Sequence, residues 1–587
     1  MVDRLHHAKL LLFLLCLVGL SLEQVSAGDC PTTFPSAVNV TLPLDADLPG
    51  EGFRLFSDLS IRLGSRVQGI GDFNGDGLND FVVSCARPQF TKIAKLGGIV
   101  PSGLAWIVYG REEHPEGDLL DLDQLNGSDG VLLVPMNEDL EREDYPFGQF
   151  MEPAGDFNGD DFKDLIISDA AYGYPGISGR IFVVYGTDKP FENGMLFMSD
   201  LNGTNGFMID AKTDGYYLGR HLGFLRDVNG DGYDDVGFTN ANTDVYVLFG
   251  REEAIADGYL GLQDVANGEN GLLVINSEDA ESRKRKKLSR QVRVTDLDAD
   301  SLPDLLFEVD ETFMGVIFGK NQKTLYSDTQ LDVASLGADD MLLLTSTGVS
   351  TGYYNPGGDF NGDGRRDTLI HTLDNNAYIL FGSPEWNDGR GSFNLATDLD
   401  DETIGIRITS AQYVIHPSEN AIVSAGDWNG DGYDDVLVRL LHDTFTGGVG
   451  SQGAAFLVFG SANPPAAIVL ENMDEQQGIL FWGTLSSGHL GSSVSAVYDF
   501  NGDNAHDIVL GEPSTFKMDE PSSFGYAYVL YGCGVAASDG DGADGGDGED
   551  GGDGSDGGPA DRMQPLFSSL TIHALKTTFF LRDCHSR

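Results

Sequence analysis

An acidic nine-residue segment recurs seven times in this chain, and it constrains the fold more than any other feature. The segment reads Asp, any residue, Asn or Asp, any residue, Asp, any three residues, Asp; the first copy is DFNGDGLND, residues 72–80. Copies begin at Asp72, Asp156, Asp227, Asp296, Asp359, Asp427 and Asp499, so neighbouring copies start 63 to 84 residues apart. A sequence pattern that recurs at intervals of this length predicts a repeat architecture, with one supersecondary unit per copy.

The residues that flank each acidic segment predict short strands. An apolar run such as FVVS (81–84) follows the segment, and a second run that ends in Gly, such as WIVYG (106–110), comes next. Most copies add a third run such as GFMI (206–209), and a fourth precedes the segment, as in LGRHLGFL (218–225). Runs of β-branched and aromatic residues bounded by Gly, Asp and Asn are typical of strands. Four strands per copy predict an all-β, seven-bladed β-propeller of four-stranded blades.

The ends of the repeat indicate how the ring would close. The strand GFRLF (52–56) has no preceding partner strand, and we expect it to complete the last blade, because an unclosed ring would leave an open edge. Cys30 and Cys533 lie on either side of this seam, and we predict a disulfide between them; the alternative is two free thiols.

The N-terminus resembles a secretory signal peptide. Arg4 and Lys9 supply positive charge before an apolar run at 10–20, and Val25-Ser26-Ala27 is a small-residue cleavage site. We therefore expect a signal peptide over residues 1–27 and a secreted or cell-surface protein, which would be periplasmic in a Gram-negative bacterium. No later run is long and apolar enough to predict a transmembrane segment in the mature chain.

Composition changes sharply after the repeats. Residues 28–534 form the predicted propeller, 535–561 an Asp/Gly-rich spacer too poor in apolar residues to bury a core, and 562–587 a tail with no assignment. The full chain has 92 acidic and 36 basic residues, a formal charge of −56. Such a polyanion is repelled by phosphates, so we expect no nucleic-acid partner.

The acidic segments suit a hard divalent cation. Oxygen side chains at positions 1, 3, 5 and 9 of a tight loop, without His or Cys, favour Ca²⁺ over zinc. The alternative is a polar Asx-type turn that holds no metal. The predicted ligands are Asp72, Asn74, Asp76, Asp80, Asp156, Asn158, Asp160, Asp164, Asp227, Asn229, Asp231, Asp235, Asp296, Asp298, Asp300, Asp304, Asp359, Asn361, Asp363, Asp367, Asp427, Asn429, Asp431, Asp435, Asp499, Asn501, Asp503 and Asp507.

The seven copies are not identical. Copies 1, 3, 5 and 6 keep Gly at position 6, where a sharp turn is needed, whereas copies 2, 4 and 7 carry Asp161, Ser301 and Asn504. Copy 4 also has Asp298 at position 3, where the other copies have Asn. On sequence alone copy 4 therefore ranks last as a calcium site.

The chain resembles the FG-GAP repeat family, whose best-known members are the N-terminal propellers of integrin α subunits. The resemblance rests on the acidic loops, on Leu63-Gly64, Phe147-Gly148, Leu218-Gly219 and Leu490-Gly491 upstream of them, and on the closing Tyr-Gly or Phe-Gly pairs. It implies calcium in hairpin loops on one rim and a ligand on the opposite loops. The chain departs from the family pattern at Leu288-Ser289, where Phe-Gly is expected, and it lacks the GAP triplet.

A partner is expected on the opposite loops. Those near 86–103, 442–452 and 513–523 are long, and a basic run lies at 283–293; ordinary loop variation and a solvated basic loop are the alternatives. We predict a non-catalytic protein that mediates adhesion or binds an extracellular protein or glycan ligand, because no HExxH or GxSxG motif is present. The alternatives are a propeller-borne hydrolase or lyase and a calcium-stabilised structural module without a specific ligand.

Overall fold

The computed structural model describes part of the chain, all of it within the compact unit Met1–Ala536. The described residues are 39–42, 52–60, 62–85, 103–115, 118–136, 146–170, 179–211, 218–240, 245–275, 291–310, 313–319, 329–346, 351–399, 403–416, 418, 420–440, 452–483, 488–513 and 525–533. The predicted signal peptide (1–27), spacer (535–561) and tail (562–587) lie outside them, as do Cys30 and most of the long loops and basic run. None of the helices in these ranges has the length and apolar character needed to cross a membrane.

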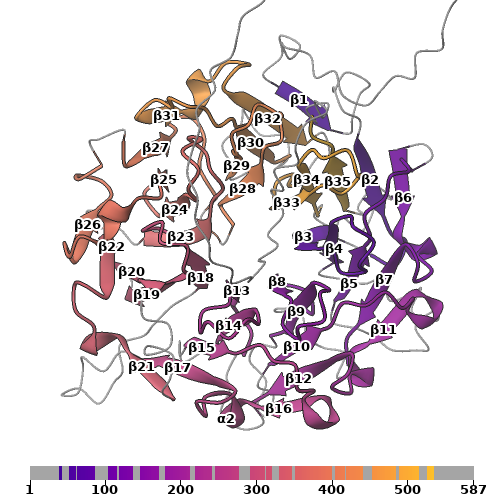
Figure 1. Cartoon of the computed structure of the whole chain (residues 1–587). Helices are drawn as coiled ribbons and strands as arrows, with labels where there is room; N and C mark the ends of the chain where they lie inside the picture. Colours follow the sequence, from indigo (N-terminus) through magenta and orange to yellow (C-terminus); the bar gives the residue numbers. More distant parts are fainter. Residues whose placement is uncertain are drawn as a thin grey trace, which may run out of the picture. The chain divides into compact units, whose positions relative to one another are not determined.

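Within the described residues the strands form seven sheets, which are the blades of a seven-bladed β-propeller (Figure 1). Each blade is a meander of four antiparallel strands, with its first strand innermost. Blade 1 has β3 (Leu63–Gly71), β4 (Asp80–Cys85), β5 (Leu104–Val108) and β7 (Gly130–Val134); blade 2 has β8 (Met151–Gly155), β9 (Asp164–Asp169), β10 (Arg180–Val184) and β12 (Gly206–Asp210); blade 3 has β13 (Leu222–Arg226), β14 (Asp235–Thr239), β15 (Val245–Leu248) and β17 (Gly271–Ile275); blade 4 has β18 (Val292–Thr295), β19 (Asp304–Asp310), β20 (Phe313–Ile317) and β22 (Met341–Thr345). Blade 5 has β23 (Thr351–Pro356), β24 (Thr368–Thr372), β25 (Asn376–Leu380) and β27 (Gly405–Thr409); blade 6 has β28 (Ile422–Gly426), β29 (Asp435–Leu440), β30 (Ala454–Val458) and β32 (Gly478–Gly483); blade 7 has β33 (Ser493–Tyr498), β34 (Asp507–Glu512), β35 (Tyr526–Leu530) and β2 (Gly52–Phe56).

The prediction of four-stranded blades is wrong, because every sheet has a fifth strand on its outer edge. The fifth strand pairs in parallel with the fourth and comes from the connection that precedes the fourth strand of the next blade. It covers an edge that would otherwise present unpaired backbone groups. The fifth strands of blades 1 to 7 are β11 (Met195–Phe197), β16 (Tyr259–Gly261), β21 (Gln330–Asp332), β26 (Ser392–Asn394), β31 (Ala467–Val469), β1 (Asn39–Leu42) and β6 (Leu119–Asp121).

The helical segments within the described ranges are single turns that lie between strands. They are η3 (Leu122–Gln124), η4 (Glu192–Gly194), η5 (Met198–Asp200), η6 (Ala256–Gly258), α2 (Leu262–Val265), η8 (Val333–Ser335), η9 (Pro384–Asn387) and η11 (Leu470–Asn472). Several follow a fifth strand directly and turn the chain back toward its own blade.

The hydrophobic core lies between blades. Seven clusters of buried apolar side chains each join two neighbouring blades. In the cluster between blades 7 and 1, Phe53 and Leu55 on β2 pack in the same core as Trp106 on β5. Because the middle strands of a blade contact a neighbour on each face, they are apolar along their whole length, as in LAWIV of β5.

The N-terminal strand β2 pairs with the third strand of the last blade. Gly52 lies opposite Leu530, and Leu55 lies opposite Ala527, in antiparallel register. β2 thus occupies in blade 7 the place that β7 occupies in blade 1. The predicted disulfide remains a prediction, because Cys30 lies outside the described residues; Cys533 itself is buried.

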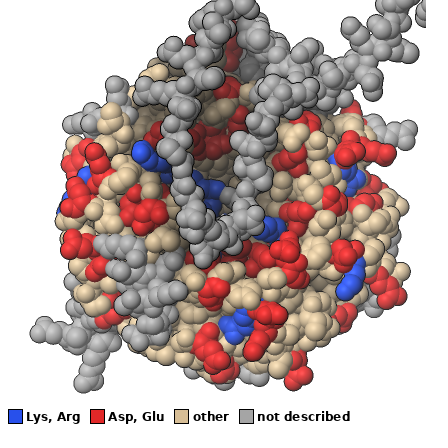
Figure 2. All heavy atoms as spheres, in the orientation of Figure 1, with Lys and Arg blue, Asp and Glu red and all other residues tan. Residues whose placement is uncertain are grey.

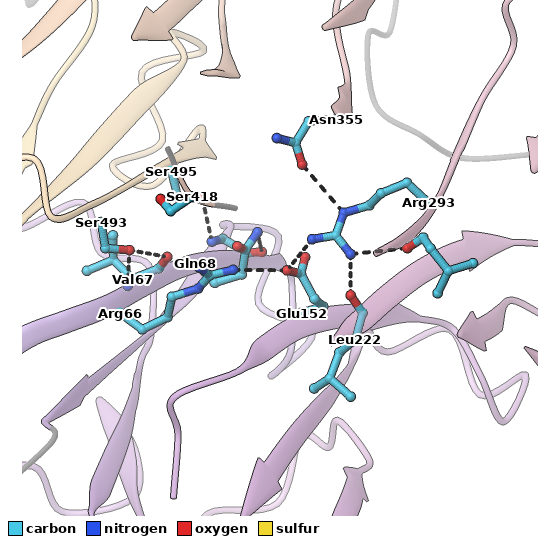
Figure 3. Close-up of polar contacts among 12 residues, drawn as sticks. Arg66, Val67, Gln68, Glu152, Leu222, Arg293, Asn355, Ser418, Ser493 and Ser495 are labelled. Carbon is cyan, nitrogen blue, oxygen red and sulfur yellow. Dashed lines mark hydrogen bonds and ion pairs between the residues drawn. The ribbon is translucent and has the colours of Figure 1, made fainter. Parts of the chain in front are cut away.

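Polar side chains tie the innermost strands together around the centre of the ring (Figure 3). Arg66 on β3 and Arg293 on β18 both donate to Oε1 of Glu152 on β8, at 3.2 and 2.8 Å. Arg293 also donates from Nε to Oδ1 of Asn355 on β23 (3.4 Å), and Asn355 donates to the carbonyl oxygen of Ile422 on β28 (2.9 Å). These buried contacts connect blades 1, 2, 4, 5 and 6.

Blade 7 is joined to both of its neighbours in the same way. The Oγ atoms of Ser493 and Ser495 accept from the backbone N–H groups of Val67 (2.9 Å) and Gly69 (3.0 Å) on β3. On the other side, Arg439 of β29 donates from Nε to the carbonyl oxygen of Gly491, just before β33, at 2.8 Å. The ring of first strands is therefore continuous, with β33 in contact with both β28 and β3.

Candidate metal centres in the acidic loops

The seven acidic segments are the loops between the first and second strands of the blades, and in all seven the residues at positions 4 and 6 have a positive φ. In loop 1 the carboxylate of Asp72 accepts from the N–H groups of Gly75 (2.6 Å), Asp76 (3.1 Å) and Gly77 (2.9 Å). Asn74 donates from Nδ2 to Oδ2 of Asp76 at 2.9 Å. These bonds fold the chain around the position-1 carboxylate, as expected for an Asx-type turn.

Position 6 is left-handed in every loop, including the three loops that lack glycine there. Its backbone φ is 71° at Asp161, 69° at Ser301 and 64° at Asn504, compared with 91° at Gly77 in loop 1. In each loop the N–H of position 6 donates to Oδ2 of position 1, for example from Ser301 to Asp296 at 3.0 Å. The absence of glycine therefore does not change the turn, although a side chain in this region costs about 1–2 kcal/mol.

The aspartate at position 9 is fully buried in all seven loops and is anchored to the backbone at both oxygens. In loop 1, Oδ2 of Asp80 accepts from the N–H of Phe73 (2.8 Å) and Oδ1 accepts from the N–H of Gly110 (2.7 Å), which closes the third strand. The same pair of bonds occurs at Asp164, Asp235, Asp304, Asp367, Asp435 and Asp507.

These two bonds explain the glycine that ends each third strand, whose role the sequence did not reveal. At Gly186, for example, an added Cβ would lie 2.5 Å from the carbonyl oxygen of Lys163 and 2.6 Å from that of Phe73. The glycine therefore allows the strand end to approach the loop closely enough for its N–H to reach Asp164. Burial raises the pKa of Asp164 well above its usual range, with Asp160 also raising it, so this carboxylate is held at an electrostatic cost.

Loop 4 brings three carboxylates together. One ligand oxygen from each of Asp296, Asp298 and Asp304 lies within 4.8 Å of the others. Asp298 is only 4% exposed, and its Oδ1 has no hydrogen-bond partner, while its Oδ2 accepts from Nδ2 of Asn387 at 2.8 Å. Burial raises the pKa of Asp298, and Asp300 and Asp296 raise it further.

The position-3 aspartate gives loop 4 a carboxylate where the other six loops have the amide of an Asn; the ranking of the loops as calcium sites stays a prediction. Among the described residues, this loop is the one in which oxygens of three carboxylates lie within 4.8 Å of one another. A buried carboxylate oxygen without a partner is costly unless something fills its coordination. The donor set, oxygen atoms only, fits a hard cation such as Ca²⁺.

The face of the propeller drawn in Figure 2 is strongly acidic. Asp and Glu atoms cover much of it, Lys and Arg atoms are few, and the surface is hollowed near the centre. This distribution follows the composition of the chain, with its formal charge of −56.

Comparisons with known proteins add a likeness at the level of shape. One solved structure that the chain resembles is BBS1N in complex with ARL6DN, at 8% sequence identity and a TM-score of 0.35; the match covers 83% of this chain and 99% of that one. No family model matches the chain, and no curated protein matches it. The assignment as a seven-bladed propeller rests on the strand pairing described above.

Proposed function

We propose that this chain is a calcium-binding propeller of the FG-GAP type that binds an extracellular protein or glycan and catalyses no reaction. We infer further that the protein is secreted or held at the cell surface, and that the pairing of β2 with β35 and a Cys30–Cys533 disulfide close its ring. The calcium proposal rests on the acidic loops, ring closure by β2 rests on its pairing with β35, and secretion and the disulfide rest on the sequence.

The observation that carries the calcium proposal is the unpartnered Oδ1 of Asp298. It lies beside Asp296, which is partly exposed, and Asp304, which is buried, and among the described residues it has no hydrogen-bond partner of normal geometry. Asp296, Asp298 and Asp304 would hold the ion in loop 4, and positions 1, 3 and 5 would supply ligands in the other loops. Bound calcium would supply positive charge against carboxylates that repel one another.

The position-9 aspartates have a second role. Because both oxygens of each already accept from backbone N–H groups, these residues connect the loop to the third strand whether or not an ion is present. We propose that calcium bound at the loops stiffens the rim, while the loops at the other end of the blades remain available for a partner.

The experiment is a calcium titration of the mature full-length protein after removal of metal with EDTA, followed by thermal unfolding. For extracellular modules with Kd of about 10⁻⁴–10⁻³ M, a few millimolar Ca²⁺ adds roughly 1–2 kcal/mol of stability per occupied site. We expect the unfolding temperature to rise by several degrees with Ca²⁺ and much less with Mg²⁺. An unchanged unfolding temperature, with no heat of binding by calorimetry, would contradict the calcium assignment.

Recognition needs a separate test. The same protein is applied to arrays of matrix proteins and glycans in Ca²⁺ and in EDTA. We expect a ligand that is retained in Ca²⁺ and released in EDTA. Stabilisation by Ca²⁺ without any bound ligand would favour the structural module, and turnover of a glycan would favour the hydrolase or lyase.

A further inference from the structure

We propose that Asp234, Asp434 and His506, at position 8 of loops 3, 6 and 7, are positioning residues that hold the first ligand of the preceding loop. Through them, metal occupancy is coupled between loops 2 and 3 and among loops 5, 6 and 7. This inference rests on the proposed calcium function, and it assigns a role to residues outside the predicted ligand set.

This proposal rests on three hydrogen bonds, each of which crosses a boundary between two blades and joins a position-8 side chain to the backbone N–H of position 1 in the preceding loop. Oδ2 of Asp234 accepts from the backbone N–H of Asp156 at 2.7 Å. Oδ2 of Asp434 accepts from the N–H of Asp359 at 2.6 Å. Nδ1 of His506 accepts from the N–H of Asp427 at 2.7 Å.

In each case the donor is the position-1 aspartate, whose carboxylate organises its own loop. The bond therefore fixes the backbone from which that carboxylate projects.

Room for each contact is provided by the glycine before position 1. A Cβ added to Gly155 would lie 2.0 Å from Oδ2 of Asp234, and one added to Gly358 would lie 2.0 Å from Oδ2 of Asp434. At Gly426 the added atom would lie 2.1 Å from Nδ1 of His506. The glycine and the position-8 acceptor of the next loop thus form a matched pair at three boundaries.

Two of these boundaries carry a second contact. Tyr233, at position 7 of loop 3, covers Gly159 of loop 2 so closely that an added Cβ would lie 2.4 Å from its ring. Tyr433 of loop 6 covers Gly362 of loop 5 in the same way, at 2.3 Å. Each pair of loops is therefore packed at its tip as well as hydrogen-bonded at its base.

Three other boundaries lack the side-chain chemistry for this contact. Position 8 is Lys163 in loop 2, Pro303 in loop 4 and Arg366 in loop 5, and none of these side chains can accept a hydrogen bond. Lys163 donates its N–H to the carbonyl oxygen of Asp72 at 3.0 Å, and its side-chain carbons pack near Gly71, where an added Cβ would lie 2.9 Å from Cγ. The chain therefore contains its own comparison between boundaries with and without a side-chain acceptor.

The physical basis of the coupling is the shared cost of ordering two loops. Asp234 directly precedes Asp235, the position-9 aspartate that loop 3 uses to anchor itself. An ion in loop 3 restricts residues 231–235 and so holds Asp234 against loop 2. Loop 2 then loses less conformational freedom when its own ion binds, which is positive cooperativity without a large change of shape.

The test is hydrogen exchange of the full-length protein, followed by mass spectrometry across a Ca²⁺ titration. We expect peptides that span loops 2 and 3 to gain protection at the same Ca²⁺ concentration. Asp231→Asn weakens the ion site of loop 3 without touching loop 2. In this variant we expect the Ca²⁺ midpoint of loop 2 to rise about fivefold or more, while that of loop 1 stays unchanged.

A second part of the hydrogen-exchange test removes the hydrogen bond between Asp234 and the N–H of Asp156 directly. Asp234→Ala should speed exchange in loop 2 in EDTA and raise its Ca²⁺ midpoint, and Asp234→Asn, which keeps an acceptor oxygen, should restore most of the loss. Lys163→Met is the matched control at a boundary without an acceptor: it keeps the side-chain carbons near Gly71, loses the charge, and should leave loop 1 unchanged. If Asp234→Ala fails to fold, the Asp231→Asn arm still decides the matter.

The outcomes separate the coupling from the calcium proposal. Loops 2 and 3 that titrate independently, or an unchanged loop 2 in Asp231→Asn, overturn the coupling and leave calcium binding intact. A complete absence of calcium-dependent protection in every loop overturns both.

Discussion

Arg293 in blade 4 donates from Nη2 to Oε1 of Glu152 in blade 2, at 2.8 Å, although blade 3 lies between them. Arg293 also donates from Nη1 to the carbonyl oxygen of Leu222, on the first strand of that intervening blade. With its bond to Asn355 in blade 5, this arginine ties four blades together at the centre of the ring, and Glu152 adds blade 1 by accepting from Arg66.

Replacing Glu152 should be strongly destabilising. Both arginines are buried, so Glu152→Ala leaves two guanidinium groups without their carboxylate, at a cost of about 3–5 kcal/mol. The midpoint of urea unfolding should fall accordingly, and Glu152→Gln, which keeps an acceptor oxygen, should fall less. A loss below about 1 kcal/mol for Glu152→Ala would show that the contact contributes little to stability.

Positions 5 and 9 of one acidic loop should respond differently to substitution. Asp164→Asn puts an amide NH₂ where a carboxylate oxygen accepts a backbone N–H, so it should cost about 2 kcal/mol in both Ca²⁺ and EDTA. Asp160→Asn, at position 5, should matter little in EDTA and should reduce the stabilisation by Ca²⁺. Thermal unfolding of both variants in both buffers makes the comparison, and equal behaviour would contradict the anchoring role of Asp164.

The glycine that closes a third strand should not tolerate a side chain. Gly186→Ala places a methyl group against two backbone carbonyl oxygens, at 2.5 and 2.6 Å, and should cost about 1–3 kcal/mol. Gly337→Ala is the control, because no atom lies within 4 Å of its added Cβ. Denaturant unfolding of the two variants should separate them clearly; equal stabilities would mean that the strand end can move.

Asp298→Asn should have opposite effects with and without metal. Without metal, the substitution removes a buried negative charge that lies beside Asp296 and Asp300, so the unfolding temperature in EDTA should stay the same or rise. With Ca²⁺, it removes a charged ligand, so the stabilisation by Ca²⁺ should shrink. Asp188→Asn, at an exposed position outside the loops, should change neither value. A lower unfolding temperature in EDTA together with a full response to Ca²⁺ would rule out loop 4 as an ion site.

His371 should make the protein sensitive to mild acid. It is 1% exposed, both of its ring nitrogens are buried without hydrogen-bond partners, and burial lowers its pKa to about 4, compared with about 6.5 in an unfolded chain. The folded state therefore binds the proton less tightly than the unfolded state does. The free energy of unfolding is therefore unaffected by His371 protonation above pH 6.5. It falls as the pH drops from 6.5 toward 4, by up to about 1.4 kcal/mol per pH unit.

The matched variant is His371→Leu, which cannot take up a proton. Urea unfolding of both proteins at several pH values between 4 and 7 measures the difference in their stabilities. We expect the wild-type protein to lose stability relative to the variant as the pH falls, by about 3 kcal/mol across the window. Parallel stability curves would show that His371 is already protonated in the folded state or is reached by solvent.

The sequence determined the features that depend on short stretches of chain. The turn of each acidic loop is formed by hydrogen bonds within nine residues, such as those to Asp72. The nine-residue pattern therefore predicts the turn at each place where it occurs in the sequence. The period of these loops and the apolar runs between them predicted seven blades, whereas closure of the ring by Gly52–Phe56, which pairs with β35, stays a proposal.

Only the tertiary structure decided the contacts that cross blades. The fifth strands, such as β21 (Gln330–Asp332), are three or four residues long, too short to carry a periodic signal, and their partners belong to another blade. Asp234 and Asp156 are 78 residues apart in the chain, and Arg293 and Glu152 are 141 apart. The local pattern of residues determines each turn and each strand. Which side chains contact one another across blades depends on the packing of the seven sheets, which brings strands that are distant in the sequence side by side.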